Sequence, residues 1–262
     1  MIKLSVALAT YNEEKNLTSC LEAVKDWVDE IVVVDGESID KTCQIAKEYG
    51  AKVIKTTNKP IFHINKQMAI DACRGEWVLQ LDADEIVDQD LKEAILAIVE
   101  KGSRDDAFSV RRKNFFLGRW LSKGGQYPDE VIRFFKKGQA YLPCRSVHEQ
   151  MEVSSGKIGQ LSGHLLHYPY PDFSEYLVKF NRYTQLTAQE YLNNPKIKPN
   201  VWHYILIEVK AMVEFLSRYL RHKGFYDGFP GLVFALFSAL HYPVAFIKYW
   251  EKKHDQKNKK TH

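Results

Sequence analysis

The chain has 262 residues, of which 45% are hydrophobic and 27% charged, and its formal net charge is +4. This length suits one substantial domain with an appendage, or two small domains, and this composition excludes a disordered chain. From Lys248 to the C-terminus there are six lysines and two acidic residues, so this basic tail accounts for the whole net charge. The neutral remainder predicts that nucleic acid is not a partner. Four cysteines without metal or disulfide spacing predict a reduced, cytoplasmic protein.

The first hundred residues alternate between short apolar segments and helical patterns. The strands are predicted at 2–9, 31–34, 51–55 and 77–81, and the helices at 13–27, 39–49, 61–74 and 88–101. Short apolar strands separated by helices predict an α/β fold with a parallel sheet covered on both faces. Thr10 and Glu13 match the spacing of a capping box, so we expect the first helix to begin there.

The alternation of predicted strands and helices ends after the first hundred residues, and two different sequence patterns follow. Residues 105–170 are rich in glycine, aromatic and basic residues, and we expect them to form the acceptor-binding half of a domain whose first half is 1–104. Residues 171–262 have a helical pattern that is interrupted by prolines, among them Pro230 and Pro243. The sequence therefore predicts a helical C-terminal region.

Polar residues follow three of the predicted strands. Residues 10–13 follow the first strand, Asp35 follows the second, and Asp82-Ala83-Asp84 follows the fourth. Because ligands of parallel sheets bind beyond the carboxyl ends of the strands, we expect these residues to form one site. Asp35 fits two roles, since it can accept from a ribose hydroxyl or a base N–H, or simply form the turn before Gly36.

Asp82 and Asp84 are carboxylates one residue apart on a turn that leaves a strand. Mg²⁺ and Mn²⁺ prefer such oxygen ligands and complete their coordination with substrate phosphates. A cation held there neutralises the charge that grows on a diphosphate leaving group. The pattern therefore predicts a divalent metal cofactor, with Asp84 and Asp82 as its ligands.

Three segments together resemble the successive motifs of family 2 glycosyltransferases, namely 9–14, 34–42 and 75–85. Residues 125–135 and 147–149 are similar to the branch that builds the inner core of bacterial lipopolysaccharide, which includes β-1,4-glucosyltransferases. The resemblance implies a GT-A fold, which is a Rossmann-like, mostly parallel sheet with helices on both faces, here with a helical C-terminal appendage. It also implies a UDP-sugar donor, a divalent metal (Mg²⁺ or Mn²⁺), and inversion at the anomeric carbon.

The acceptor implied by that branch is a glycolipid or an oligosaccharide of the lipopolysaccharide core, and the sugar it suggests is glucose. The resemblance implies that Asp35 binds the uridine, that Asp82 binds the ribose or the metal-side diphosphate, and that Asp84 binds the metal. With the turn after the first strand and a basic residue before the fourth, the predicted nucleotide-sugar set is Thr10, Tyr11, Asn12, Glu13, Asp35, Lys66 and Asp82.

An inverting transfer needs one base to take the proton of the acceptor hydroxyl. The resemblance places Asp129 in the region of the catalytic carboxylate, with Glu130 and Glu149 as alternatives. His148 is a candidate metal ligand, and Glu149 is also a candidate for orienting the acceptor. The basic group Arg133, Lys136 and Lys137 is either a contact for an anionic acceptor or ordinary exposed charge.

Residues 229–247 contain no charged side chain, and 204–219 has the pattern of an amphipathic helix. We expect this region to lie against the inner face of the cytoplasmic membrane, with the basic tail at anionic head groups. One alternative is a helical cap packed on the catalytic domain, and another is a helix that spans the membrane. The membrane surface is thus a predicted partner of a peripheral, cytoplasmic enzyme.

Two other functions fit parts of the sequence. One is a catalytically silent module that binds a nucleotide-sugar or a glycan on the same fold. The other is a nucleotidyltransferase, which also uses paired carboxylates, but the N-terminal part lacks a glycine-rich phosphate loop with a lysine. The joint presence of Asp35, Asp82, Asp84 and Asp129 favours the transferase.

Overall fold

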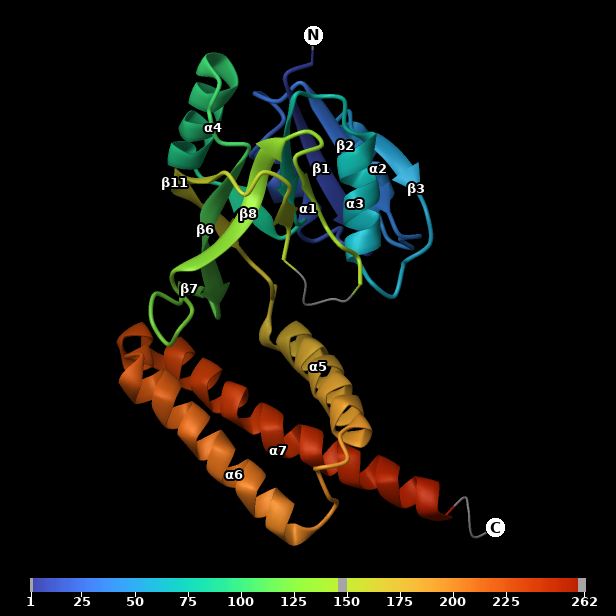
Figure 1. Cartoon of the computed structure of the whole chain (residues 1–262), viewed down its shortest axis with the longest axis vertical. Helices are drawn as coiled ribbons and strands as arrows, with labels where there is room; N and C mark the ends of the chain where they lie inside the picture. The colour runs from blue at the N-terminus through green and yellow to red at the C-terminus, as the bar shows by residue number, and fades with distance from the viewer. Residues whose placement is uncertain (1, 146–149, 259–262) are drawn as a thin grey trace. The chain divides into compact units, whose positions relative to one another are not determined.

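The computed structural model describes residues 2–145 and 150–258. It divides into two compact units, and each is described by itself (Figure 1). The first unit comprises Met1–Lys113 and Pro128–Tyr168, and the second comprises Asn114–Tyr127 and Pro169–His262.

The first unit is built on one sheet with the strand order β3-β2-β1-β4-β8-β6-β11-β5. Its strands are β1 (Leu4–Thr10), β2 (Glu30–Asp35), β3 (Lys52–Lys55), β4 (Trp77–Leu81), β5 (Glu85–Val87), β6 (Ala107–Phe116), β8 (Asp129–Lys136) and β11 (Ile158–His167). β1, β2, β3 and β4 pair in parallel, whereas β8 pairs antiparallel with both β4 and β6. The predicted parallel sheet is therefore confirmed, and the segment after residue 104 extends it with antiparallel strands.

Helices cover both faces of this sheet, as predicted (Figure 1). They are α1 (Leu17–Glu22), α2 (Thr42–Glu48), α3 (His63–Ala72) and α4 (Gln89–Lys101). On one face Leu17 of α1 and Leu91 of α4 pack with Val6 and Leu79, and on the other face Ile70 of α3 packs with Val78. Because successive side chains of a strand point to opposite faces, strands covered on both sides are apolar throughout, which explains the uninterrupted apolar runs in the sequence.

The first helix begins later than predicted, and the capping box is wrong. α1 begins at Leu17 after Asn16, while Thr10 is the last residue of β1. The turn between them is held by α2 and the residues before it, since the backbone N–H of Glu13 donates to Thr42 Oγ1 at 2.8 Å. These contacts between distant segments replace the local hydrogen bonds that a capping box would make.

The second unit is helical, as predicted, and contains α5 (Phe173–Asn193), α6 (Val201–Leu216) and α7 (Gly228–Asn258). α7 packs along both α5 and α6 (Figure 1). Its core includes Tyr191 of α5 with Phe246 and Tyr249 of α7. Pro243 lies inside α7, which continues through it, so this proline does not end the helix.

The segment 114–127 belongs to the second unit because α7 and the turn before it hold it. Buried Asp227 accepts hydrogen bonds from the backbone N–H groups of Ser122 and Lys123 and from Ser122 Oγ. Phe116, in the same segment, packs with Tyr176 of α5.

Candidate functional site

The carboxyl ends of β1, β2 and β4 lie side by side in the sheet. Thr10 is in register with Asp35, and Leu8 is in register with Leu81, which directly precedes Asp82. The three polar clusters that follow these strands in the sequence are therefore neighbours at one edge of the sheet.

Asp35 is the buried centre of the turn after β2. It is only 1% exposed, and its carboxylate accepts from Thr10 Oγ1 at 3.2 Å, from Ser38 Oγ at 2.5 Å and from the Ser38 N–H at 3.0 Å. Burial acts to raise the pKa of Asp35, but these donors and the Cys43 thiol outweigh burial, so the pKa lies below its usual value. Asp35 is therefore ionised, and its carboxylate holds the turn in place. Its contact with a nucleoside stays a prediction.

The turn after β1 is fixed to the turn after β2. Asn12 has a left-handed backbone with φ of 55°, its N–H donates to Ser38 Oγ at 2.8 Å, and its Oδ1 accepts from the Ile39 N–H at 2.9 Å. Next to it, Tyr11 is 46% exposed. The predicted residues 10–13 thus form the wall of the site between β1 and β2.

Asn65 of α3 lies beside this turn and carries a buried acceptor. A Cβ placed on Gly36 would lie 3.1 Å from Asn58 Cα and 3.3 Å from Asn65 Nδ2, so the turn packs closely on Asn65. Asn65 is 4% exposed, its Nδ2 donates to the Thr57 carbonyl at 3.2 Å, and its Oδ1 has no hydrogen-bond partner. A buried carbonyl oxygen without a donor is costly, so this atom fits an N–H group of a ligand.

Asp82 lies between two cations. It forms ion pairs with Lys66 of α3 and, at 2.8 Å, with Arg133 of β8. Burial alone would raise the pKa of Asp82, but Lys66 and Arg133 hold it far below its usual value. Asp82 is therefore ionised at every physiological pH, and it brings Lys66, the predicted basic residue, to the end of β4.

Arg133 is a buried cation, so the alternative of ordinary exposed charge is wrong for it, while its contact with an anionic acceptor stays a prediction. The residue is 8% exposed, and its guanidinium donates to Asp82, to Glu85 at 2.7 Å and to Gln80. Lys136 pairs with Asp106, and Lys137 donates to the Cys73 carbonyl. These three basic side chains are thus engaged by carboxylates and a carbonyl of the same unit that lie far from them in the sequence, so no local pattern reveals these contacts.

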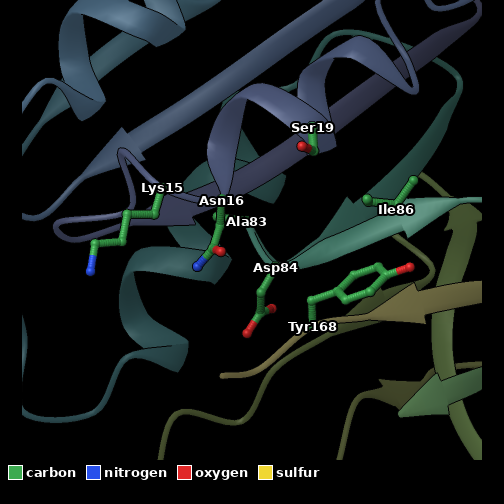
Figure 2. A pocket seen from close by; sticks show the side chains of 7 residues that line it. All are labelled: Lys15, Asn16, Ser19, Ala83, Asp84, Ile86 and Tyr168. Atoms are coloured by element: carbon green, nitrogen blue, oxygen red, sulfur yellow. The ribbon is translucent and has the colours of Figure 1, made fainter. Parts of the chain in front are cut away.

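Asp84 faces His167, the last residue of β11. His167 Nε2 lies 3.5 Å from Asp84 Oδ2, and the Tyr168 N–H donates to the Asp84 carbonyl at 2.8 Å. Asp84 also lines a cavity of about 230 Å³. Figure 2 shows this cavity between the start of α1 and the turn after β4, lined by Lys15, Asn16, Ser19, Ala83, Asp84, Ile86 and Tyr168.

The donors around Asp84 fit a divalent cation that is shared with a substrate. Within residues 2–145 and 150–258, no three His, Cys, Asp or Glu side chains are close enough to hold a metal by themselves. Asp84 and His167 would supply one oxygen and one nitrogen ligand, and Mg²⁺ or Mn²⁺ commonly takes its remaining ligands from phosphates and water. Asp82, paired with Lys66 and Arg133, is a less available ligand than predicted.

Asp129 begins β8 opposite Arg112 of β6. The Arg112 guanidinium lies 2.9 Å from Asp129 Oδ2, and it also reaches Glu85 Oε1 at 3.4 Å. Since Glu85 directly follows Asp84, this contact ties the predicted base to the turn after β4. The alternative Glu130 contacts Arg111 and Gln160 instead.

The remaining predicted residues, His148 and Glu149, lie outside the described residues. The predictions for the metal shell, the acceptor and the alternative base that rest on them stay predictions.

Sequence reasoning missed His167 and Arg112 and assigned Arg133 to the wrong role. His167 is the last residue of β11 and precedes Tyr168-Pro169. Its position before this Tyr-Pro pair is the one local feature that marks the end of the strand. Arg112 and Arg133 lie inside strands, where an arginine predicts an exposed edge as readily as a buried pair.

Comparisons with known proteins show the family and the fold of this chain. Residues 5–156, more than half of the chain, match the model of glycosyl transferase family 2. The chain is 29% identical over 251 residues to an uncharacterized glycosyltransferase of Rickettsia typhi, covering 91% of this chain and 84% of the relative. It is 26% identical over 251 residues to the lipopolysaccharide core biosynthesis glycosyltransferase LpsC of Rhizobium meliloti, covering 91% of each.

Among solved structures, that of S. aureus TarS 1-349 in complex with UDP has a TM-score of 0.51. It is 18% identical in sequence, and the match covers 98% of this chain and 92% of the TarS 1-349 chain. At this identity the likeness shows the fold, which is GT-A. The family model and the curated relatives together show that this chain is a glycosyltransferase and belongs to family 2.

Proposed function

We propose that this glycosyltransferase moves a sugar from a UDP-sugar to a glycolipid or a lipopolysaccharide-core oligosaccharide, by one inverting displacement that depends on a divalent metal. The observation that carries the proposal is the group of three carboxylates, a lysine and a histidine at one edge of the sheet: Asp35, Lys66, Asp82, Asp84 and His167. The relative LpsC is a lipopolysaccharide core biosynthesis glycosyltransferase, and the TarS complex holds UDP. Both support the substrate classes proposed here.

The nucleoside end of the donor lies, in this proposal, at the turns after β1 and β2. Asn65 Oδ1 is a buried acceptor that fits the imide N–H of a pyrimidine base. Asp35 keeps the two turns together through Thr10 and Ser38, and Tyr11 offers an exposed ring beside them. This assignment makes Asp35 chiefly an organiser of the pocket.

The diphosphate lies beside Lys66 and Asp84. Lys66 supplies a positive charge that Asp82 positions, and Lys15 lines the adjoining cavity. Asp84 and His167 would hold the metal, with Asp82 beside them. When bound, a divalent cation there neutralises negative charge on the departing diphosphate.

Asp129 is the proposed base. The acceptor hydroxyl oxygen forms the new bond to the anomeric carbon while the bond from that carbon to the diphosphate oxygen breaks, and the hydroxyl proton moves to Asp129. The Arg112 guanidinium pairs with the Asp129 carboxylate and also with Glu85, the residue after Asp84. Arg112 therefore links Asp129 to the turn after β4. A base that is fixed in this way is ready for proton transfer without a conformational search.

We further propose a cytoplasmic enzyme that is peripheral on the inner face of the membrane. Within the described part of the chain, the segment Gly224–Asp255 is long and apolar enough to cross a bilayer by length and composition, and 33% of its most apolar window is buried. The basic residues after it in the sequence suit an anionic surface.

The test is metal-dependent release of UDP by the purified full chain, screened across UDP-sugars and other nucleotide-sugars. We expect release with a UDP-sugar, stimulation by a glycolipid acceptor, and loss in Asp84→Ala. Asp71→Ala, which removes an exposed carboxylate of α3, is the matched control and should keep the activity. Binding of UDP-sugars without release, across the acceptors tested, would favour a catalytically silent module instead.

A further inference from the structure

We infer that α6 attaches the protein to the surface of an anionic lipid bilayer through one exposed apolar face. This inference deepens the peripheral location proposed above by naming the surface that makes the contact. The face, called here the α6 stripe, consists of Trp202, Ile205, Leu206, Val209, Met212 and Val213.

Each residue of the α6 stripe is highly exposed. The exposed fractions run from 45% for Ile205 to 72% for Trp202, and Val213 is 60% exposed. With about 100° between successive residues of a helix, the six side chains occupy about 120° of the circumference. The charged residues Glu208 and Lys210 fall outside this sector, so the stripe is apolar without interruption.

The opposite side of α6 already has its packing partners. Ala211 is buried, and Tyr204 and Ile207 pack against the core that α5 and α7 form. A surface helix of a globular protein needs one apolar face, which it turns to the core. α6 has a second one, and exposed apolar surface of this extent marks an interaction site.

The apolar surface continues onto α7. A groove of about 260 Å³ joins the start of α6 to the end of α7, where Val201 lies beside Ile247 and Trp250. Ile247 is 54% exposed and Trp250 is 46% exposed. Tryptophan at this kind of boundary is typical of side chains that lie at the level of lipid head groups.

Basic residues flank α6 at both ends. Lys196 and Lys198 precede it, Arg221 and Lys223 follow it, and all four are exposed. An apolar helix face between clusters of positive charge is the pattern of helices that lie in the plane of an anionic membrane interface. Pairing of α6 with a second copy of the chain would bring basic ends next to basic ends in either direction, which is unfavourable. The charge distribution therefore favours lipid over a second copy.

The test is flotation of the full-length chain with vesicles of phosphatidylcholine, with or without phosphatidylglycerol. We expect the wild type to float with the anionic vesicles and to dissociate as salt is raised. The variant Val209→Glu/Val213→Glu places two charges in the stripe and should bind at least about tenfold more weakly, a change of about 1.4 kcal/mol. Val178→Glu on α5, at a site that is 63% exposed, is the matched control and should float like the wild type.

A second measurement locates the contact. Trp202 fluorescence, taken as the difference between the wild type and Trp202→Phe, should shift to the blue and be quenched by brominated lipid when anionic vesicles are added. Equal flotation of the stripe variant and the wild type would overturn the inference. So would a dimer in size-exclusion chromatography that the stripe variant converts to a monomer, because the occupant would then be a second copy.

Release of UDP by the stripe variant separates this inference from the proposed function. The α6 stripe is not among the proposed donor-binding residues, so UDP release in the absence of membranes should be unchanged. Loss of flotation with normal release tests only the docking surface, whereas a wild-type chain that floats without releasing UDP would overturn the function alone.

Discussion

Arg112 and Asp129 face each other across the β6–β8 pair, with the Arg112 guanidinium 2.9 Å from Asp129 Oδ2. The same guanidinium reaches Glu85, one residue beyond Asp84. One arginine therefore joins the proposed base to the turn that carries the proposed metal ligand. Two carboxylates held by a shared cation keep a constant separation, which a base and a metal acting on the same substrate require.

The first prediction concerns the base. Asp129→Asn should keep the affinity for UDP-sugar and lower the turnover number by about a thousandfold, because it removes the proton acceptor while an amide oxygen can still accept from Arg112. Arg112→Gln should lower turnover less, by about tenfold, because the carboxylate loses its fixed position. Steady-state kinetics with donor-binding calorimetry check both. Unchanged turnover in Asp129→Asn would move the base to Glu130 or Glu149.

The second prediction concerns the metal. His167→Ala should weaken Mn²⁺ binding in the presence of UDP by about tenfold or more, since it removes one of the two proposed protein ligands. Electron paramagnetic resonance titration of Mn²⁺ measures this directly, without relying on turnover. His164→Ala is the control on the same strand, because His164 contacts Asp88 at 3.3 Å and not Asp84. Equal Mn²⁺ affinity in the two variants would exclude His167 as a ligand.

The third prediction concerns stability and pH. Asp82 has a strongly lowered pKa in the folded protein, against the ordinary value of 3.8. A group with a lowered folded pKa stabilises the protein fully above its unfolded pKa, and this contribution is lost as pH falls below that value. Asp82→Asn should therefore lower the free energy of unfolding by about 2 kcal/mol near pH 6, and by less near pH 3. Urea denaturation at both pH values measures it, and an equal difference at both would contradict the assignment.

The fourth prediction concerns the nucleoside. Asn65→Leu removes the buried Oδ1 acceptor and should weaken binding of both uridine and UDP by about tenfold, while binding of pyrophosphate is unchanged. Isothermal titration calorimetry with the three ligands separates the effects. Gln44→Leu, on the exposed side of α2, serves as the comparison and should bind all three normally. A parallel loss of pyrophosphate binding in Asn65→Leu would point to a general collapse of the site.

The donor half of the site was predictable from the sequence because the positions of the strands and the polarity of the residues that follow them are local signals. Apolar runs such as β2 and β4 identify buried parallel strands, and the residue that ends each run must lie at the carboxyl edge of the sheet. That rule predicts from the sequence alone that Asp35 and Asp82 lie near each other. The capping-box spacing of Thr10 and Glu13 is a local signal too, but it misplaced the start of α1. The N–H groups of Asn12 and Glu13 donate instead to Ser38 Oγ and Thr42 Oγ1.

Asp82-Ala83-Asp84 illustrates what the sequence by itself determined and what the tertiary structure decided. The sequence determined that the two carboxylates follow a buried strand, because an uninterrupted apolar run is visible in consecutive residues. Only the tertiary structure decided their different surroundings, with Asp82 between Lys66 and Arg133 and Asp84 opposite His167. These partners come from α3, β8 and β11, and pairing between strands far apart in the chain brings them together. Contacts of that kind depend on sheet order and register, which no local pattern contains.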